Sequence, residues 1–349
     1  MTMPVCLRTI ASWFPDDSVP VRTLPETSDL SPRQQKIIHN LGVDEVREAG
    51  ALTEVDLARN AALAVLERSG TDAAGLDGLI LVQGRVPEYL ISSEATRLQR
   101  AIGADGAMTL GVGELGCVSS SAALSVAAGL FATNPDWQRI LLAMGVKTPT
   151  AQRYRHPMTV LGDGGLAVLL TRDGPGRFRM LDHVLESDGR YADLFRIRYR
   201  DCIAEDWMEE CSDLNVYSFH LAMDSRNRFQ RLNKRLLDRS GSAGEEPHSH
   251  VMQNLSVGAF AFWEEALGTR FLPSCAENLR GYGHVGPVDV LLNLDVAATR
   301  IAPGERVLAL NSSPVAAWSS ALFERLPDSE LPDSDLLSGA PPTPDRSDG

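Results

Sequence analysis

Short, uninterrupted apolar runs separated by helical patterns constrain the fold of this chain more than any other feature. Three such runs lie in the first half, at residues 78–83, 139–144 and 166–170. Runs of this length are typical of strands that are buried on both faces. Residues 54–69 carry apolar side chains at helical spacing and end at Gly70, a common residue at helix ends. The alternation predicts a layered α/β architecture.

The second half of the chain repeats this pattern. Residues 255–267 and 288–296 have helical patterns, and residues 306–310 form another apolar strand-like run. A repeated pattern of this kind predicts two halves of similar fold, related by a pseudo-twofold axis. We place the first half at residues 1–172 and the second at residues 173–325.

A short echo links the two halves. Gly-Cys-Val at 116–118 opens a helix of small residues in the first half, and Gly-His-Val at 283–285 opens the corresponding helix of the second. A match of this length also arises by chance, so it is weak evidence for duplication when taken alone. If the halves are duplicated, the pseudo-twofold axis brings Cys117 and His284 face to face.

Beyond residue 325 the composition changes. Residues 326–349 are rich in Pro, Asp, Ser and Gly and contain few large apolar side chains. Such a segment cannot bury enough surface to offset its ordering entropy, so we expect a disordered tail. No run of 18 uncharged apolar residues and no basic segment before a long apolar one is found, so we expect neither a transmembrane helix nor a signal peptide. A cytoplasmic location is expected.

Cysteine usage and charge exclude several classes of function. The chain has 5 cysteines, an odd number without a C-x-x-C pair, which indicates reduced thiols and neither a disulfide framework nor a zinc site. We expect no metal and no cofactor. The net charge of −13 argues against binding to nucleic acid or to an anionic membrane surface. It is compatible with an acidic protein partner that meets a local basic patch.

Cys117 is the candidate nucleophile. It follows Gly116 and leads directly into the small-residue helix. A helix N-terminus carries partial positive charge and free N–H groups, both of which favour the reactive thiolate. The same N–H groups can stabilise an oxyanion on a bound acyl group. The alternative is a buried cysteine that packs as a small hydrophobe, which is how we interpret the other four.

Several motifs in order resemble those of the β-ketoacyl-acyl-carrier-protein synthase III family of the thiolase superfamily. They are the Cys117 segment, LGDGGLAVLL at 161–170, YGHVGPVD at 282–289 and the final strand pair. The resemblance runs from about residue 5 to residue 325. It implies a thiolase-like fold with layers in the order α-β-α-β-α, a nucleophilic Cys117, an acyl carrier protein or carrier domain as partner, and a homodimer.

The chain departs from this family at the other catalytic positions. Family enzymes use a histidine and an asparagine from the motifs HQAN and GN, to bind the enolate formed in decarboxylative condensation. Here the HQAN-like stretch at 251–254 begins with Val251, and the GN pair reads Gly283-His284. The histidine therefore occupies the asparagine position. His250 lies one residue early, and we interpret it as a surface histidine.

A single histidine beside a cysteine is the minimum for acyl transfer. His284 can accept the thiol proton and later deprotonate an incoming hydroxyl or amine. Asp289 lies five residues further on, in the first turn of a helix. It can orient His284 and complete a Cys-His-Asp triad. Alternatively, it is a helix N-terminal carboxylate that satisfies free N–H groups, and the two roles are compatible.

Two further departures concern substrate binding. The segment at 36–43, which the resemblance places at the coenzyme A site, lacks an aromatic residue to stack on adenine, so a carrier-bound donor is favoured over a coenzyme A ester. The closing loop at 311–315 lacks glycine, and Val315 takes the place of the family's second oxyanion N–H donor. We assign Val315, together with Asn254 of the HQAN-like stretch, to oxyanion or substrate binding.

A basic segment at 226–239 is the candidate docking surface for an acidic carrier. Arg228, Arg231 and Arg235, followed by Arg239, recur at helical spacing and form a stripe. Such a stripe would steer a carrier protein towards the site. The alternative is an ordinary solvated helix face.

These residues favour an acyltransferase of natural-product biosynthesis. The resemblance implies transfer of an intact acyl group from a carrier-protein thioester, through Cys117, to a hydroxyl, an amine or a second carrier. The alternative enzyme is a chain-initiating ketosynthase that performs decarboxylative condensation, with His284 acting alone. A non-catalytic partner subunit is a third hypothesis, and the presence of both Cys117 and His284 argues against it.

Overall fold

A mixed sheet of nine strands forms the centre of the protein in the computed structural model, which describes residues 5–84, 87–89, 91–241, 246–315 and 317–327. Across the sheet the strands follow the order β13-β14-β15-β10-β1-β9-β6-β4-β5. In this order their bounds are Ser249–Met252, Arg306–Ser313, Ala317–Arg325, Phe178–Ser187, Val5–Trp13, Gly164–Thr171, Arg139–Val146, Gly78–Val82 and Met108–Val112. The apolar runs predicted as buried strands are β4, β6, β9 and β14.

The strand pairing repeats itself about the contact between β1 and β10. On one side β1 pairs antiparallel with β9, β9 antiparallel with β6, and β6 parallel with β4. On the other side β10 pairs antiparallel with β15, β15 antiparallel with β14, and β14 parallel with β13. A short antiparallel pairing of β1 with β10 joins the two sets. The topology therefore has the two-fold repetition that the sequence predicts.

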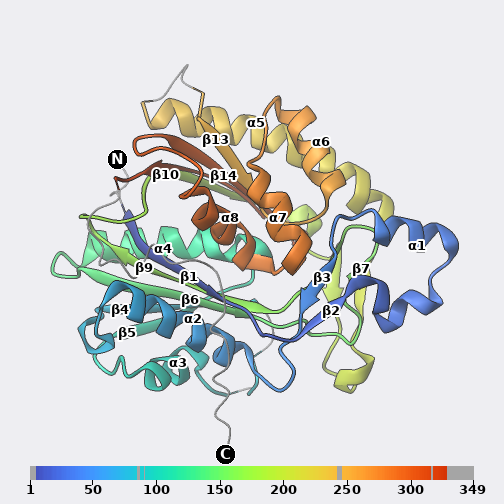
Figure 1. Ribbon diagram of the computed structural model, residues 1–349, viewed down its shortest axis with the longest axis horizontal. Helices are drawn as coiled ribbons and strands as arrows, with labels where there is room; N and C mark the ends of the chain where they lie inside the picture. The colour runs from blue at the N-terminus through green and yellow to red at the C-terminus, as the bar shows by residue number, and fades with distance from the viewer. Residues whose placement is uncertain (1–4, 85–86, 90, 242–245, 316, 328–349) are drawn as a thin grey trace, which may run out of the picture.

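Helices form three layers around the two sets of strands (Figure 1). Helices α2 (Glu54–Ser69) and α3 (Glu94–Ile102) cover the outer face of the first set, and α5 (Leu221–Arg239), with α6 (Val257–Leu267) packed on it, covers the second. Helix α4 (Ser119–Thr133) contacts β4, β5 and β10, and α8 (Asp289–Ala297) contacts β13, β14 and β1. Both central helices thus touch both sets, and the predicted α-β-α-β-α layering is confirmed.

Local sequence signals set the helix ends. Helix α2 begins after Thr53, whose side chain accepts a hydrogen bond from the Asp56 backbone N–H while the Asp56 carboxylate accepts one from the Thr53 backbone. Such a capping box satisfies two N–H groups that the helix leaves free. The helix ends at Gly70, in the left-handed conformation that favours glycine. The predicted helix at 54–69 is therefore confirmed.

Helix α4 is a strongly apolar helix of the protein's interior. Together with the preceding turn it forms the 18-residue stretch Gly116–Thr133, which has a mean hydropathy of 1.4. By length and composition alone this stretch could cross a membrane. In the fold 56% of it is buried, because it lies between the two sets of strands. Its small residues fit a helix packed on several sides.

Shorter elements surround the end of the fold where α4 begins. They are β2 (Ser18–Pro20), α1 (Pro32–His39), β3 (Glu45–Arg47), β7 (Tyr154–Arg155), β8 (Thr159–Val160), β11 (Phe195–Ile197), β12 (Glu209–Cys211) and α7 (Pro273–Tyr282). Three antiparallel pairs form among them, β2 with β3, β7 with β8 and β11 with β12.

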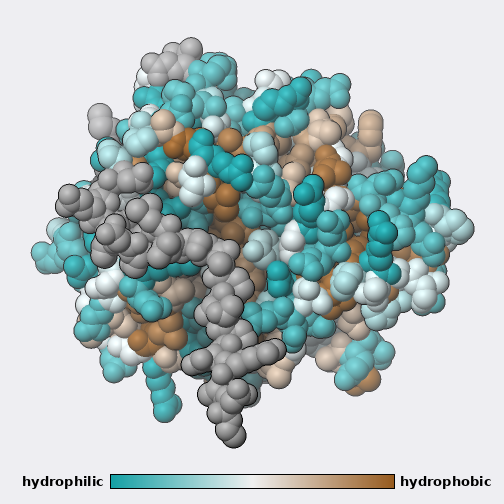
Figure 2. All heavy atoms as spheres, viewed as in Figure 1, coloured by the Kyte–Doolittle hydropathy of each residue, from teal (hydrophilic) through white to brown (hydrophobic). Residues whose placement is uncertain are grey.

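The chain remains part of the packed fold up to Leu326, which is buried and whose backbone N–H binds the Arg177 carbonyl. The predicted tail lies outside the described residues from residue 328 onwards. Hydrophilic side chains dominate the face in Figure 2, where apolar ones gather only in small groups.

Two glycines that face each other across β6 and β9 allow α2 to approach the sheet. Gly145 and Gly165 are register partners. A Cβ atom on Gly145 would overlap the backbone of Glu54, and one on Gly165 would overlap the backbone of Leu57. The first two turns of α2 therefore rest directly on this glycine pair.

We expect Gly145→Ala to destabilise the protein by on the order of 3 kcal/mol, because the helix backbone must move to admit the methyl group. The free energy of unfolding from urea denaturation measures the effect. Gly129→Ala is the matched control, since Gly129 is exposed in α4 and its Cβ would meet nothing within 4 Å. It should stabilise by about 0.5–1 kcal/mol through helix propensity. Equal effects of the two changes would contradict the proposed close contact.

Candidate active site

Cys117 lies in the turn Gly116–Val118 that leads from β5 into α4. Its side chain is buried, with 6% of its surface exposed. The Asn311 side-chain amide donates a hydrogen bond of 2.8 Å to the Cys117 backbone carbonyl. The thiol is therefore held by strand β14 of the other half, and it faces the start of α8.

His284 lies opposite Cys117, as the echo of the two Gly-x-Val turns predicts. Its Nε2 atom is 3.3 Å from Cys117 Sγ. The His284 backbone N–H donates to the Val160 carbonyl at 2.8 Å, and its own carbonyl accepts from the Gly162 N–H at 3.1 Å. Gly283 has φ of +65°, a conformation that favours glycine, and a Cβ atom there would collide with Val160. The turn is thus locked to the segment after β8.

The LGDGG motif holds the segment after β8 in place through Asp163. The Asp163 carboxylate accepts hydrogen bonds of 2.8 Å from the backbone N–H groups of Ala49 and Thr148. It also pairs with Arg153 at 3.0 Å, and its side chain is 1% exposed. A buried carboxylate with this many donors fixes the surrounding loops. The motif thereby positions the backbone that holds His284.

Asp289 completes a chain of contacts with Cys117 and His284. Its Oδ2 atom is 2.6 Å from His284 Nδ1 and accepts a hydrogen bond of 3.0 Å from the Asn254 N–H. Its Oδ1 atom accepts one of 2.8 Å from the Val285 N–H. The side chain is completely buried. Asp289 thus contacts the histidine and also satisfies free N–H groups near the helix start, so the geometry accommodates both predicted roles.

The buried charges perturb each other. Burial lowers the pKa of His284, but the charges of Cys117 and Asp289 raise it more, so that it lies above its ordinary value. Burial raises the pKa of Asp289, although His284 and the backbone N–H groups of Val285 and Asn254 oppose that effect. The imidazolium is therefore favoured while a thiolate is beside it.

Two predicted oxyanion residues have other contacts in this structure. The Asn254 backbone N–H donates a hydrogen bond to Asp289. The side-chain oxygen of Asn254 accepts a hydrogen bond of 2.8 Å from Asn293, so Asn254 is a structural support for Asp289. The Val315 N–H donates to the Ser313 hydroxyl at 3.3 Å. Their predicted role in binding the oxyanion stays a prediction.

Gln253 holds the closing loop, a role that sequence reasoning missed. Its side-chain oxygen accepts from the Ser312 N–H at 3.1 Å, and its Nε2 atom donates to the Ser312 carbonyl at 3.1 Å and hydroxyl at 2.7 Å. Gln253 is 2% exposed. The glutamine of the HQAN-like stretch was the available signal, but its partner is 59 residues away.

Two cavities meet at Cys117 and His284. The first, which we call the apolar arm, has a volume of about 300 Å³ and lies between the start of α5 and α6, among side chains that include Met158, Leu221, Phe262 and Trp263. The second, the wide arm, has a volume of about 830 Å³ and extends past Lys147, Tyr199 and Trp207. Cys117, Arg155, His284, Ser313 and Pro314 line both. The Cys117 thiol is therefore accessible from two directions.

Arg155, which sequence reasoning also missed, lines both arms although it is only 7% exposed. Its guanidinium forms an ion pair with Glu209 of β12, with Nε 2.7 Å from Oε2. Burial lowers the pKa of Arg155, but Glu209 raises it more, so the group stays charged. Burial also raises the pKa of Tyr217, on the wall of the apolar arm, to about 12.

The predicted docking stripe is only partly exposed. Arg228 is 8% exposed, lies over the Trp318 ring at 4.3 Å and pairs with Glu186, Asp188 and Asp224. Arg228 is therefore not part of the docking surface, because it is buried and paired. Helical spacing could not predict this, since the residues that bury it are distant in the sequence. Arg231 and Arg235 are exposed on the outer side of α5.

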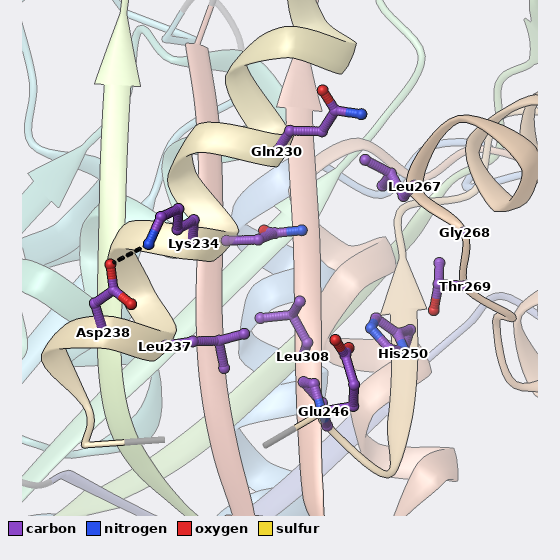
Figure 3. A pocket seen from close by; sticks show the side chains of 12 residues that line it. Gln230, Lys234, Leu237, Asp238, Glu246, His250, Leu267, Gly268, Thr269 and Leu308 are labelled. Atoms are coloured by element: carbon purple, nitrogen blue, oxygen red, sulfur yellow. Dashed lines mark hydrogen bonds and ion pairs between the residues drawn. The ribbon is translucent and has the colours of Figure 1, made fainter. Parts of the chain in front are cut away.

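His250 is remote from the thiol. It lies on β13 and faces a separate pocket between α5 and α6, with Glu246 and Thr269 near it and Lys234 across the pocket on α5 (Figure 3). Burial lowers its pKa to about 4, so the ring is neutral near pH 7. Within the described residues, no group of three or more His, Cys, Asp or Glu side chains could hold a metal ion.

The chain of contacts predicts strong coupling between His284 and Asp289. His284→Ala should lower turnover by a factor on the order of 10² to 10⁴, the usual range for a general base. Asp289→Asn should have a large effect in the wild type and almost none in the His284→Ala background. It should also lower the pKa of His284, since it removes a negative charge. A double-mutant cycle on kcat and ¹⁵N NMR of labelled histidine measure both effects.

The control is Asp77→Asn, since Asp77 also accepts two backbone N–H groups but lies away from the site. It should lower the melting temperature without changing kcat. If Asp289→Asn behaves in the same way, Asp289 is only a helix-end residue.

Comparisons with known proteins agree with this architecture. A β-ketoacyl-acyl-carrier-protein synthase III of Rubrobacter xylanophilus is 32% identical over 143 residues, which span 41% of this chain and 44% of that protein. A synthase III of Syntrophomonas wolfei is 34% identical over 158 residues, or 44% of this chain and 46% of that protein. The matched segments thus span less than half of these relatives. No protein-family model matches the sequence.

The similarity in structure covers nearly the whole chain. ChlB3, described as an acyltransferase, has a TM-score of 0.78 at 20% identity, over 93% of this chain and 98% of its own. The synthase III of Pseudomonas aeruginosa has a TM-score of 0.74 at 20% identity, over 93% and 98%. The chain therefore has the thiolase-like fold of the β-ketoacyl-acyl-carrier-protein synthase III enzymes, as its sequence motifs predict.

Proposed function

We propose that the chain is an acyltransferase that moves an intact acyl group from a carrier-protein thioester to a hydroxyl, an amine or a second carrier. The observation that carries this proposal is the continuous contact from Cys117 through His284 to Asp289, located where the two arms meet. A thiol, a base and an oriented carboxylate are the groups that acyl transfer requires.

The first half-reaction acylates the enzyme. The Cys117 thiolate attacks the thioester carbonyl carbon, the bond to the carrier sulfur breaks, and the leaving sulfur takes the proton of His284. In the second half-reaction, neutral His284 accepts the proton of the acceptor as its oxygen, nitrogen or sulfur attacks the same carbonyl. The bond to Cys117 then breaks, which restores the thiolate and the imidazolium. The negative charge of Asp289 stabilises the imidazolium at both stages.

Decarboxylative condensation fits these residues less well. It generates an enolate, which a pair of neutral donors would hold. Val251 occupies one of the two positions that the resemblance assigns to these donors, and it is completely buried. His284, at the other, is bound to Asp289 through Nδ1. One polar side chain therefore remains where two are needed.

A chain-initiating ketosynthase is the second candidate. It is favoured by the names of the matched relatives, which are β-ketoacyl-acyl-carrier-protein synthases III. In that case Nε2 of His284 alone would donate to the enolate oxygen. The two candidates share the acylation of Cys117 and differ in the fate of the carboxylate carbon.

The proposal extends to the protein's setting. An acidic acyl carrier protein is the proposed partner, with Arg231 and Arg235 as its docking residues. The five free cysteines fit a cytoplasmic protein. The outer edge of β5 has no strand partner within the described part of the chain, which supports a homodimer. Natural-product biosynthesis of the polyketide or antibiotic type follows from the resemblance alone.

Product analysis tests the acyltransferase. Intact-mass spectrometry after incubation with acyl-carrier thioesters should detect acylation at Cys117, and none in Cys117→Ala. With a malonyl carrier and an acyl donor, no carbon dioxide should be released, because the product keeps every carbon of the donor. Acylation of Cys117→Ala would reject the nucleophile. Stoichiometric decarboxylation with chain extension would select the ketosynthase.

The docking proposal is tested by charge reversal. Arg231→Glu combined with Arg235→Glu should raise the KM for a carrier-bound donor by roughly tenfold, because two rim charges then repel the acidic carrier. The KM for a pantetheine thioester should change little. Arg270→Glu is a matched control, because Arg270 is 82% exposed and pairs only at the surface with Glu264. Equal effects on both donors would indicate an ordinary solvated face.

A further inference from the structure

The wall shared by the two arms contains a cation that the proposed mechanism does not use. Arg155 is on β7, is 7% exposed and lines both arms beside Cys117. Its Nε and Nη2 atoms are occupied by Glu209. Its Nη1 atom has no partner within the described ranges of the chain. Of the five guanidinium N–H groups, three, two of them on Nη1, are therefore left to whatever enters the cavity.

The surroundings of Arg155 determine what these N–H groups can bind. Its guanidinium carbon is 5.0 Å from the centre of the Phe195 ring, and this stacking contact helps to fix the plane of the guanidinium group. Nη1 is not one of the fully buried donors without a partner, and Arg155 lines both cavities, so an oxygen atom that enters there can accept a charge-assisted hydrogen bond from it. The Glu209 carboxylate already balances the positive charge. A second carboxylate would approach Glu209 and be repelled, so a neutral oxygen is the better ligand.

The neighbouring apolar arm determines the size and polarity of the rest of the ligand. Its volume of about 300 Å³ is at the lower end for small-molecule sites. Met158, Leu221 and Trp263 are among its lining side chains, which suit a hydrocarbon body of moderate size. Because Arg155 and Cys117 both line the junction of the two arms, we take the bound oxygen to lie near the carbonyl carbon attached to Cys117.

We propose that Arg155 selects the donor: a neutral acyl group of moderate size that carries a hydroxyl or oxo oxygen on its third carbon. The hydrocarbon body occupies the apolar arm, and the oxygen accepts hydrogen bonds from Nη1 of Arg155. This inference rests on the proposed function only in requiring that Cys117 becomes acylated.

The test compares the N-acetylcysteamine thioesters of hexanoate, 3-hydroxyhexanoate and glutarate on the wild-type protein. Intact-mass spectrometry at successive times gives the rate constant for acylation of Cys117. The 3-hydroxyhexanoyl donor should react roughly 10- to 100-fold faster than the hexanoyl donor, the range of a charge-assisted hydrogen bond. Glutaryl should be the slowest. Equal rates for the first two donors, or fastest loading of glutaryl, would overturn the proposal without any variant.

Variants assign the preference to Arg155. In Arg155→Gln combined with Glu209→Gln, which removes both charges together, the ratio of the two rates should fall to near one. Arg190→Gln is the matched control, since Arg190 is 68% exposed and pairs with Asp188 away from the arms; it should keep the wild-type ratio. If the double variant slows both donors by the same factor, Arg155 acts on the thioester carbonyl or only holds β12, and the selection is rejected.

This experiment separates the two proposals. Acylation of Cys117 is common to the acyltransferase and the ketosynthase, so the donor preference can be measured whichever second half-reaction follows. Release of carbon dioxide would therefore reject the proposed transfer and leave the result for Arg155 standing. Absence of a preference would reject the role of Arg155 and leave the transfer standing.

Discussion

The arrangement of the site depends on the buried carboxylate of Asp289. A completely buried carboxylate is tolerated only when donors surround it. Here they come from separate parts of the chain: His284 and the Val285 N–H before α8, and the Asn254 N–H after β13. Satisfying one charge therefore fixes the start of α8, the end of β13 and the imidazole relative to one another. The catalytic geometry of the second half follows from that requirement.

The pseudo-twofold arrangement supplies the other half of the site. Because α4 and α8 are the two helices of the central layer, the turns before them lie against each other, with Cys117 on one and His284 on the other. This much could be predicted from two echoing Gly-x-Val turns and from strand and helix patterns, since periodicity depends only on neighbouring residues. The spacing of Asp289 from His284 is likewise local, and it also indicated a contact.

What the sequence did not indicate depends on contacts between distant segments. Arg228 has the spacing of an exposed stripe, but Trp318, from a strand near the C-terminal end of the fold, covers it. Arg155 has no local pattern, because its partner Glu209 lies 54 residues away. Gln253 likewise acts on a loop far along the chain. The direction of the Val315 N–H depends on backbone angles that composition does not determine. Long-range pairing of this kind requires the fold.

The charged groups around Cys117 contact partners of opposite charge. The Asp289 carboxylate binds His284, which lies beside the Cys117 thiol, and Arg155 is paired with Glu209. In the proposed acylation, the thiolate charge and the proton of His284 leave together, so the net charge of the buried site does not change. Moving a charge without its counterion into such an interior would be costly. This conservation of charge is consistent with the proposed transfer of neutral acyl groups, because a carboxylate that bound Arg155 would lie near Glu209.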